Sequence, residues 1–150
     1  MTNDLTIRPA SPHDYDSIAD VWFDSWVSTG LGQTSDASRD DLRQRLETED
    51  DWDLLVVIRH ERLSGMLALK PRSAKLDQIF VHPEVKGQGI GRRLMREAKE
   101  RLPDGMWLKA HRRNVNALRF YRSEGFIPDL ERPYGDHGPD DIFLTWRPAR

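Results

Sequence analysis

The segment Lys86-Gly87-Gln88-Gly89-Ile90-Gly91 constrains the fold of this chain more than any other. It lies between an apolar run typical of a strand, Ile79 to Val81, and a segment with helical spacing that ends near Leu102. Alternate glycines allow backbone conformations that other residues resist, so amide groups can turn into one concavity. The following helix adds unpaired N–H groups and the positive end of its dipole. The pattern predicts a strand–loop–helix unit that binds phosphate oxygens.

Two common phosphate-binding patterns do not fit this segment. A mononucleotide P-loop needs Lys-Ser or Lys-Thr after its last glycine, whereas Gly91 is followed by Arg92 and Arg93. The dinucleotide fingerprint needs two residues before its last glycine, and only Ile90 separates Gly89 from Gly91. A nucleotide-binding protein of another fold is therefore disfavoured.

A second segment, Asn114-Val-Asn-Ala117-Leu-Arg-Phe120-Tyr121-Arg-Ser-Glu-Gly125-Phe126, follows a predicted strand at Met106 to Ala110. The two segments together resemble the signatures of the GNAT N-acetyltransferases, Q/R-x-x-G-x-G/A followed by N-x-x-A-x-x-F/L-Y-x-x-x-G-F. Lys86 stands where the family has Arg or Gln. The resemblance covers about residues 75 to 127, and the opening Leu5 to Ala10 also resembles the family's amino terminus.

The resemblance implies that acetyl-coenzyme A is the co-substrate. The scattered spacing of the histidines gives the separate expectation that no metal is bound. The backbone of the first strand would pair with pantetheine, and the N–H of Val81 would polarise the thioester oxygen. The glycine loop would bind the pyrophosphate, Asn114 would contact the coenzyme while capping its helix, and Ala117 and Phe120 would pack beside it. The predicted coenzyme-binding residues are Ile79, Phe80, Val81, Lys86, Gly87, Gln88, Gly89, Ile90, Gly91, Arg92, Asn114, Ala117 and Phe120.

Two residues are predicted to be catalytic. The resemblance places the hydroxyl of Tyr121 near the sulfur, where it would protonate the leaving thiolate; the alternative is a core tyrosine on an amphipathic helix. Asp77 interrupts an apolar strand, and a half-buried carboxylate with a raised pKa would serve as general base. A solvent-facing acid at the strand edge is the equal alternative for Asp77. Lesser candidates for the base are His82, His111, Glu131 and Asp24, and many family members use no dedicated base.

Composition narrows the class of protein. The 150 residues predict one domain, residues 1–150, and a net charge of -2 argues against nucleic-acid binding. The absence of cysteine removes disulfides and thiolate metal sites. No apolar run reaches membrane-spanning length, so we expect no membrane partner and a cytoplasmic location. The five histidines lack paired metal-ligand spacing; they are His13, His60, His82, His111 and His137.

The order of predicted elements gives the fold class. An edge strand at 5–9 and two capped helices precede a strand at 54–58. A hairpin turn at 59–62 leads to a second strand that runs through Leu69, and a third strand is predicted at about 75–81. A helix at 89–102, a strand at 106–110, a helix at 115–123 and a strand at 142–146 follow. We expect a mixed, mostly antiparallel α/β sheet with helices on both faces. The resemblance adds a central strand pair that splays apart to admit pantetheine.

The function predicted is transfer of an acetyl group from acetyl-coenzyme A to a primary amine, by direct attack in a ternary complex. The acceptor is a small molecule or a protein amino group. Trp26, near the end of the first helix, would line the acceptor cleft, and core packing is favoured for Trp22. The alternative is a non-catalytic acyl-coenzyme A sensor module, which would have no reason to keep Tyr121. A homodimer is left open beside a monomer.

Overall fold

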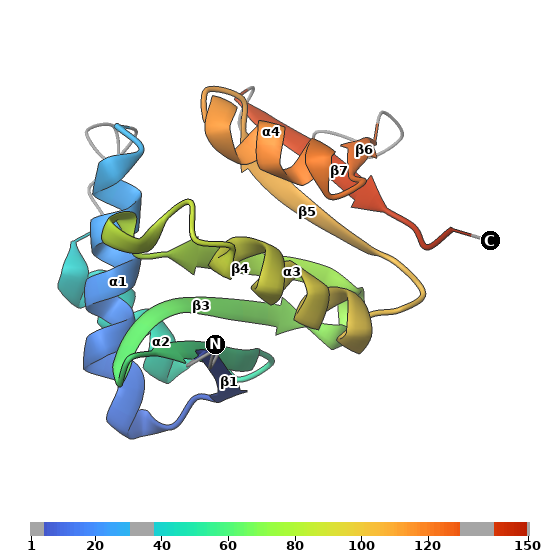
Figure 1. Ribbon diagram of the computed structural model, residues 1–150. Helices are drawn as coiled ribbons and strands as arrows, with labels where there is room; N and C mark the ends of the chain where they lie inside the picture. The colour runs from blue at the N-terminus through green and yellow to red at the C-terminus, as the bar shows by residue number, and fades with distance from the viewer. Residues whose placement is uncertain (1–4, 31–37, 130–139, 150) are drawn as a thin grey trace.

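The computed structural model describes residues 5–30, 38–129 and 140–149 (Figure 1). Glu131 and His137, named above as a candidate base and a histidine without metal-ligand spacing, lie outside the described residues. Within the described ranges, no helix is long and apolar enough to cross a membrane.

The N-terminal region consists of strand β1 (Leu5–Pro9), helix α1 (Tyr15–Ser28) and helix α2 (Arg39–Thr48). A 3-10 turn at Pro12–Asp14 precedes α1, and the carboxylate of Asp14 accepts the N–H of Ser11 at 2.9 Å. The same carboxylate accepts hydrogen bonds from both terminal nitrogens of Arg8, at 2.8 and 2.9 Å. These bonds fix the path of the chain from β1 into α1.

Three strands form an antiparallel meander: β2 (Asp53–Arg59), β3 (Arg62–Lys70) and β4 (Lys75–Val81). The tight turn between β2 and β3 uses positive φ angles at His60 and Glu61. The register between β3 and β4 shifts after Ala68, which pairs with Gln78, while Leu69 pairs with Leu76. Asp77 is therefore the extra residue of a β-bulge in β4.

The second half of the chain consists of α3 (Ile90–Arg101), β5 (Met106–His111), α4 (Val115–Ser123), β6 (Ile127–Pro128) and β7 (Asp141–Trp146). In the part of the chain that the structure describes, one sheet has seven strands in the order β1-β2-β3-β4-β5-β7-β6. Among these described strands, β4 and β5 form the only parallel pair. The predicted fold class and element order are confirmed, and β6 is a short strand that was not predicted.

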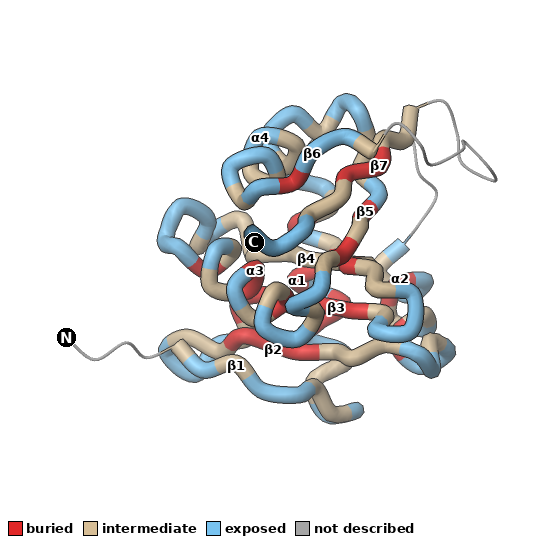
Figure 2. Tube along the Cα trace, turned by 90° about the vertical axis from the view of Figure 1, so that its right-hand side faces the viewer, coloured by how far each residue is buried: buried red, intermediate tan, exposed pale blue. Residues whose placement is uncertain are grey.

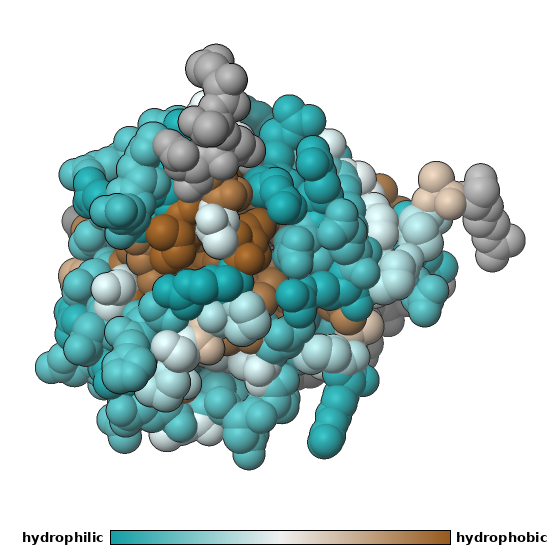
Figure 3. Space-filling model, turned by 60° about the horizontal axis from the view of Figure 1, so that its bottom comes forward, coloured by the Kyte–Doolittle hydropathy of each residue, from teal (hydrophilic) through white to brown (hydrophobic). Residues whose placement is uncertain are grey.

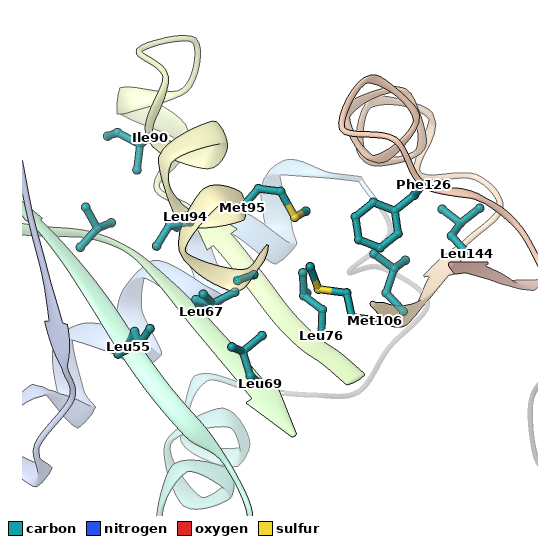
Figure 4. Close-up of a cluster of buried hydrophobic side chains, with 13 residues drawn as sticks. Leu55, Leu67, Leu69, Leu76, Ile90, Leu94, Met95, Met106, Phe126 and Leu144 are labelled. Atoms are coloured by element: carbon teal, nitrogen blue, oxygen red, sulfur yellow. The ribbon is translucent and has the colours of Figure 1, made fainter. Parts of the chain in front are cut away.

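Separate apolar cores cover the two faces of the sheet. On one face, α1 and α2 pack Ile18, Trp22 and other buried side chains against Val56, Met66 and Ala68. On the other, α3 packs against alternate residues of the same strands, and this core continues to β5 and β7 (Figure 4). Its members include Leu55, Leu67, Leu69, Leu76, Leu94, Met95, Met106, Phe126 and Leu144. Figure 2 shows buried segments of β2, β3, β5 and β7 between more exposed helices.

The strands β1 to β4 form one part of the sheet, and β5, β7 and β6 form the other. These two parts meet at the β4–β5 pair, whose strands lie apart along most of their length. β4 and β5 share one paired position, Lys75 with Trp107, and then diverge (Figure 1). The closed end is held by Trp107, whose backbone N–H donates to Ala74 O at 3.0 Å and whose indole N–H donates to Ser73 O at 2.9 Å. The expected splayed strand pair is therefore present.

Candidate active site

A cavity of about 700 Å³ occupies the space that opens between β4 and β5. Its wall is built from the last turns of α1, most of β4, the loop before α3, the end of β5 and one side of α4. More of its exposed lining is apolar than polar. Figure 3 shows the other side of the molecule, the bottom of Figure 1 near β1 and β2; that face is mostly hydrophilic, with apolar side chains gathered in one hollow. A cavity with apolar walls and a few polar groups is the usual form of a small-molecule site.

The glycine loop forms one end of the cavity, and its geometry explains its sequence. Gly87 and Gly89 both have φ of +83°, in the left-handed region that other residues rarely adopt. A Cβ atom at either position would meet nothing within 4 Å, so the backbone borders open space. The amides from Gly87 to Arg92 have no backbone hydrogen-bond partner in the described chain. This loop fits a pyrophosphate, since free amides and a helix N-terminus favour negative charge.

The open edge of β4 supplies further backbone donors. The N–H of His82 donates to Ser64 O on β3 at 2.8 Å. Because N–H groups alternate between the two edges of a strand, the N–H of Val81 points to the opposite edge, toward the cavity. Ile79, Phe80 and Val81 all line the cavity, although the Phe80 ring also packs on Trp22, with centroids 5.8 Å apart.

Helix α4 brings Tyr121 to the same cavity. Tyr121 is half-buried between the rings of Phe120 and Phe126, with centroids 5.7 and 5.8 Å away. Burial raises the pKa of Tyr121 to about 12, because the phenolate would lose its hydration. The phenol therefore keeps its proton at neutral pH and is available as a donor. Asn114 caps the helix, its Oδ1 accepting Ala117 N–H at 3.3 Å, and both residues line the cavity.

The other predicted coenzyme contacts divide into two groups. Lys86 lines the cavity and its Nζ lies 3.5 Å from Ser28 Oγ on α1, while Arg92 lines it with a largely exposed side chain. Gly91 and Ile90 also line it, and Ile90 is at the same time buried in the core. Gln88 does not line this cavity, because its amide oxygen accepts a hydrogen bond from Arg59 on β2.

The structure corrects the interpretation of Asp77. Its carboxylate accepts the indole N–H of Trp52 at 2.8 Å and lies 3.0 Å from Lys75 Nζ and 3.5 Å from Arg45. Burial alone would raise the pKa of Asp77, but the hydrogen bonds and positive charges, of Lys75 above all, lower it below its ordinary value. The expectation of a raised pKa is wrong. Although Asp77 is among the lining residues, its carboxylate is only 5% exposed and already occupied, so we withdraw it as the base.

The two histidines named as lesser candidates are also engaged. His82 accepts Glu84 N–H on Nδ1 at 3.1 Å, which places its proton on Nε2, 3.2 Å from the carboxylate of Asp24. His111, which lines the cavity, accepts Arg113 N–H on Nδ1 at 3.1 Å. Neither neutral ring has a free acceptor nitrogen. Sequence reasoning missed several lining residues, and the polar one on α1 is Ser25, which interrupts the apolar stripe of that helix.

Comparison with known proteins places the chain in a family. Residues 29–142 match the family model described as "Acetyltransferase (GNAT) domain". That match spans more than half of the chain, so the chain belongs to the GNAT acetyltransferase family, as the two motifs predicted.

Two curated relatives carry the name "Peptidyl-lysine N-acetyltransferase YjaB". The one from Salmonella typhimurium is 35% identical over 66 residues, and the one from Escherichia coli is 32% identical over 66 residues. Each alignment covers 39% of this chain and 45% or 44% of the relative, so the chain matches less than half the length of these proteins.

Solved structures share the fold over nearly the whole chain. The PaiA N-acetyltransferase of Thermoplasma acidophilum, in complex with coenzyme A, has a TM-score of 0.76 and 23% identity, covering 98% of this chain and 99% of that one. The apo form of YjaB from Escherichia coli has a TM-score of 0.73 and 23% identity, covering 97% and 96%. At these identities the likeness shows the fold alone.

Proposed function

We propose that this protein transfers the acetyl group of acetyl-coenzyme A to a primary amine within a ternary complex. The observation that carries the proposal is the shared cavity: the unpaired amides of the glycine loop, the open edge of β4 and a protonated Tyr121 all border it. Acetyl transfer needs each of these features, because the coenzyme must be held, its carbonyl polarised and its sulfur protonated.

Two segments hold different parts of the coenzyme in this proposal. Residues 86–92 hold the pyrophosphate, and the edge of β4 from Ile79 to Val81 binds the pantetheine arm, as the resemblance to GNAT proteins suggests. The N–H of Val81, directed toward the cavity, is the donor placed to stabilise negative charge on the thioester oxygen. Fixing a long flexible coenzyme in this way removes much of the entropic part of the barrier.

The chemical step conserves atoms and protons. The amine nitrogen attacks the thioester carbon, a C–N bond forms and the C–S bond breaks. Tyr121 gives its proton to the departing thiolate, and the phenolate then takes the proton that the nitrogen loses, directly or through water. The products are an N-acetyl amide and coenzyme A with a free thiol. Among the described residues, Asp77 is withdrawn, both ring nitrogens of His82 are engaged and Nδ1 of His111 is occupied, so this proposal assigns the role of base to none of these three side chains.

The acceptor we infer is the side chain of a lysine in a protein or peptide. The two curated relatives named peptidyl-lysine N-acetyltransferases support this choice. Among the described residues that line the cavity, the only carboxylate is that of Asp77, and it is already bonded to Trp52 and Lys75. The described wall therefore suits a neutral amine rather than a polycation.

The test is release of free thiol from acetyl-coenzyme A in the presence of lysine peptides, a small alkylamine and a polyamine, each followed by mass spectrometry of the acceptor. Thiol release that matches acetylated acceptor supports the enzyme. Tight binding of acetyl-coenzyme A with no transfer to any amine would contradict it and would favour an acyl-coenzyme A sensor module.

A further inference from the structure

Ser25 occupies an unusual position on α1. The buried stripe of this helix runs through Ile18 and Trp22 and reaches Ser25 one turn later, so all three face the sheet. Ile18 and Trp22 pack in the apolar core, whereas Ser25 lines the cavity. As a residue, Ser25 is only 4% exposed. A polar side chain thus replaces an apolar one where the stripe reaches the cavity.

The hydroxyl of Ser25 has no hydrogen-bond partner among the described residues, and its neighbours show how unusual this is. Ser64 is equally buried, at 4%, and donates to Arg62 O at 3.1 Å. Ser28, one turn further along α1, donates to Ser25 O at 2.7 Å. Trp26 also lines the cavity, and its indole N–H is buried with no partner in the described chain. Ser25 Oγ is not among the fully buried unpaired atoms of the described residues, so it retains contact with the cavity and is available to a bound molecule.

Contacts on either side of Ser25 locate it along the cavity. Asp24 lies 3.2 Å from the ring of His82, the residue after Val81, and Ser28 lies 3.5 Å from Lys86 Nζ in the glycine loop. The last turns of α1 therefore lie alongside the end of β4 and the start of the glycine loop. The glycine loop leads into helix α3, which packs on the face of the sheet opposite to α1. A coenzyme held by the loop leaves the α1 side of the cavity for the acceptor.

We propose that Ser25 is a positioning residue for the acceptor amine. Its Oγ accepts a hydrogen bond from one N–H of the attacking nitrogen and so turns the nitrogen lone pair toward the thioester carbon. A hydroxyl suits this role because it does not favour the protonated form, whereas a free carboxylate would stabilise the unreactive ammonium. A primary amine has an N–H to spare for this bond. This inference rests on the proposed function.

The test compares Ser25→Ala with Ser64→Ala, which removes an equally buried hydroxyl that is already bonded and lies outside the cavity. For Ser25→Ala, kcat/KM for a lysine peptide should fall about fivefold to tenfold, mainly through the KM for the amine. The Kd for acetyl-coenzyme A should not change, and Tm should stay the same or rise, because an unpaired hydroxyl has been removed. Ser64→Ala should lower Tm and leave kcat/KM unchanged.

The outcomes distinguish failure of the Ser25 role from failure of the proposed acetyltransferase function. An active wild-type protein whose Ser25→Ala variant retains kcat/KM within twofold would overturn the role of Ser25 and leave the proposed function intact. A Ser25→Ala variant that loses activity together with Tm and coenzyme affinity would show a structural residue instead. A wild-type protein that acetylates no amine while binding acetyl-coenzyme A would overturn the proposed function, and the role of Ser25 with it.

Discussion

The indole N–H of Trp52 donates to the carboxylate of Asp77 at 2.8 Å. This hydrogen bond joins the residue that precedes β2 to the bulge in β4. Arg45 of α2 stacks on the Trp52 ring, 5.3 Å from its centroid, and reaches the same carboxylate. Lys75 reaches it from the other side at 3.0 Å. Asp77 is thus the point at which α2, β2 and β4 are joined, at the place where β4 begins to leave β5.

Replacing Asp77 with Asn should therefore affect stability more than chemistry. The variant loses charge-assisted bonds to Lys75 and Arg45, and we expect the free energy of unfolding at pH 7 to fall by about 2 kcal/mol. The lowered pKa of Asp77 means that its contribution is present above the unfolded value, near 4, and is lost as pH falls through the folded value. Urea denaturation of both proteins from pH 3 to 7 measures the difference, which should narrow toward acid pH.

A matched control for this variant is Asp53→Asn, because Asp53 pairs with Arg101 at 3.0 Å nearer the surface, with 34% of its side chain exposed. Surface pairs of this kind contribute about 1 kcal/mol or less. If Asp77→Asn instead kept its stability, lost kcat/KM near neutral pH and regained it at alkaline pH, Asp77 would be the general base after all.

The glycine loop predicts a sharp difference between two variants of Gly89. Asp and Asn are nearly isosteric and both tolerate left-handed backbone, so each can adopt the φ of +83°. Only Asp places a negative charge near the pyrophosphate. The Kd for acetyl-coenzyme A should rise at least about 100-fold in Gly89→Asp, or roughly 3 kcal/mol, and much less in Gly89→Asn. Calorimetry measures both; equal affinities for the two variants would show that the loop does not bind the phosphates.

The Arg8–Asp14 pair should make the junction between β1 and α1 sensitive to acid. The hydrogen bond from Arg8 is the main cause that lowers the pKa of Asp14 to about 2 from 3.8, against the opposing effect of burial. A depressed carboxylate pKa stabilises the fold above about pH 4, and this contribution disappears as pH falls toward 2. The stability of wild-type protein should drop by about 1 kcal/mol more than that of Asp14→Asn over this window, after allowance for solvent screening of Arg8.

Denaturation at pH 2, 3, 4 and 5 measures this window, with Asp40→Asn as the control because its side chain is 94% exposed. The control should follow the wild-type curve. A parallel fall of the wild type and Asp14→Asn would mean that the pair does not stabilise the junction.

Most of the fold could be predicted from the sequence because its signals are local. The helical stripe that starts at Ile90, the N-cap at Asn114 and the apolar run of β2 each depend on neighbouring residues, and each predicted element has the predicted type. The two-residue strand β6 was not predicted, because one of its two residues is Pro128 and a polar stretch follows it; it is defined by its pairing with β7.

In the candidate site too, local features could be predicted from the sequence and long-range contacts could not. The positive φ of Gly87 and Gly89 was expected, since the requirement for glycine is a local backbone property. The environment of Asp77 was not, because Trp52 and Arg45 lie 25 and 32 residues away and meet it only in the folded chain. Sequence reasoning assigned no role to Ser25, and only the position of the cavity shows that this residue lines it.

Tyr121→Phe tests the catalytic acid directly. The variant deletes one hydroxyl and keeps the ring that packs between Phe120 and Phe126, so Tm and the Kd for acetyl-coenzyme A should hardly change. If Tyr121 protonates the thiolate, kcat should fall about 100-fold. Because its pKa is raised to about 12 by burial, the phenol remains protonated to above pH 10, and ionisation of Tyr121 should cause no decline in wild-type kcat between pH 7 and 10. Tyr15→Phe, which alters a tyrosine on α1 that does not line the cavity, is the control. Native turnover by Tyr121→Phe would leave this tyrosine a packing residue, with water as the proton donor.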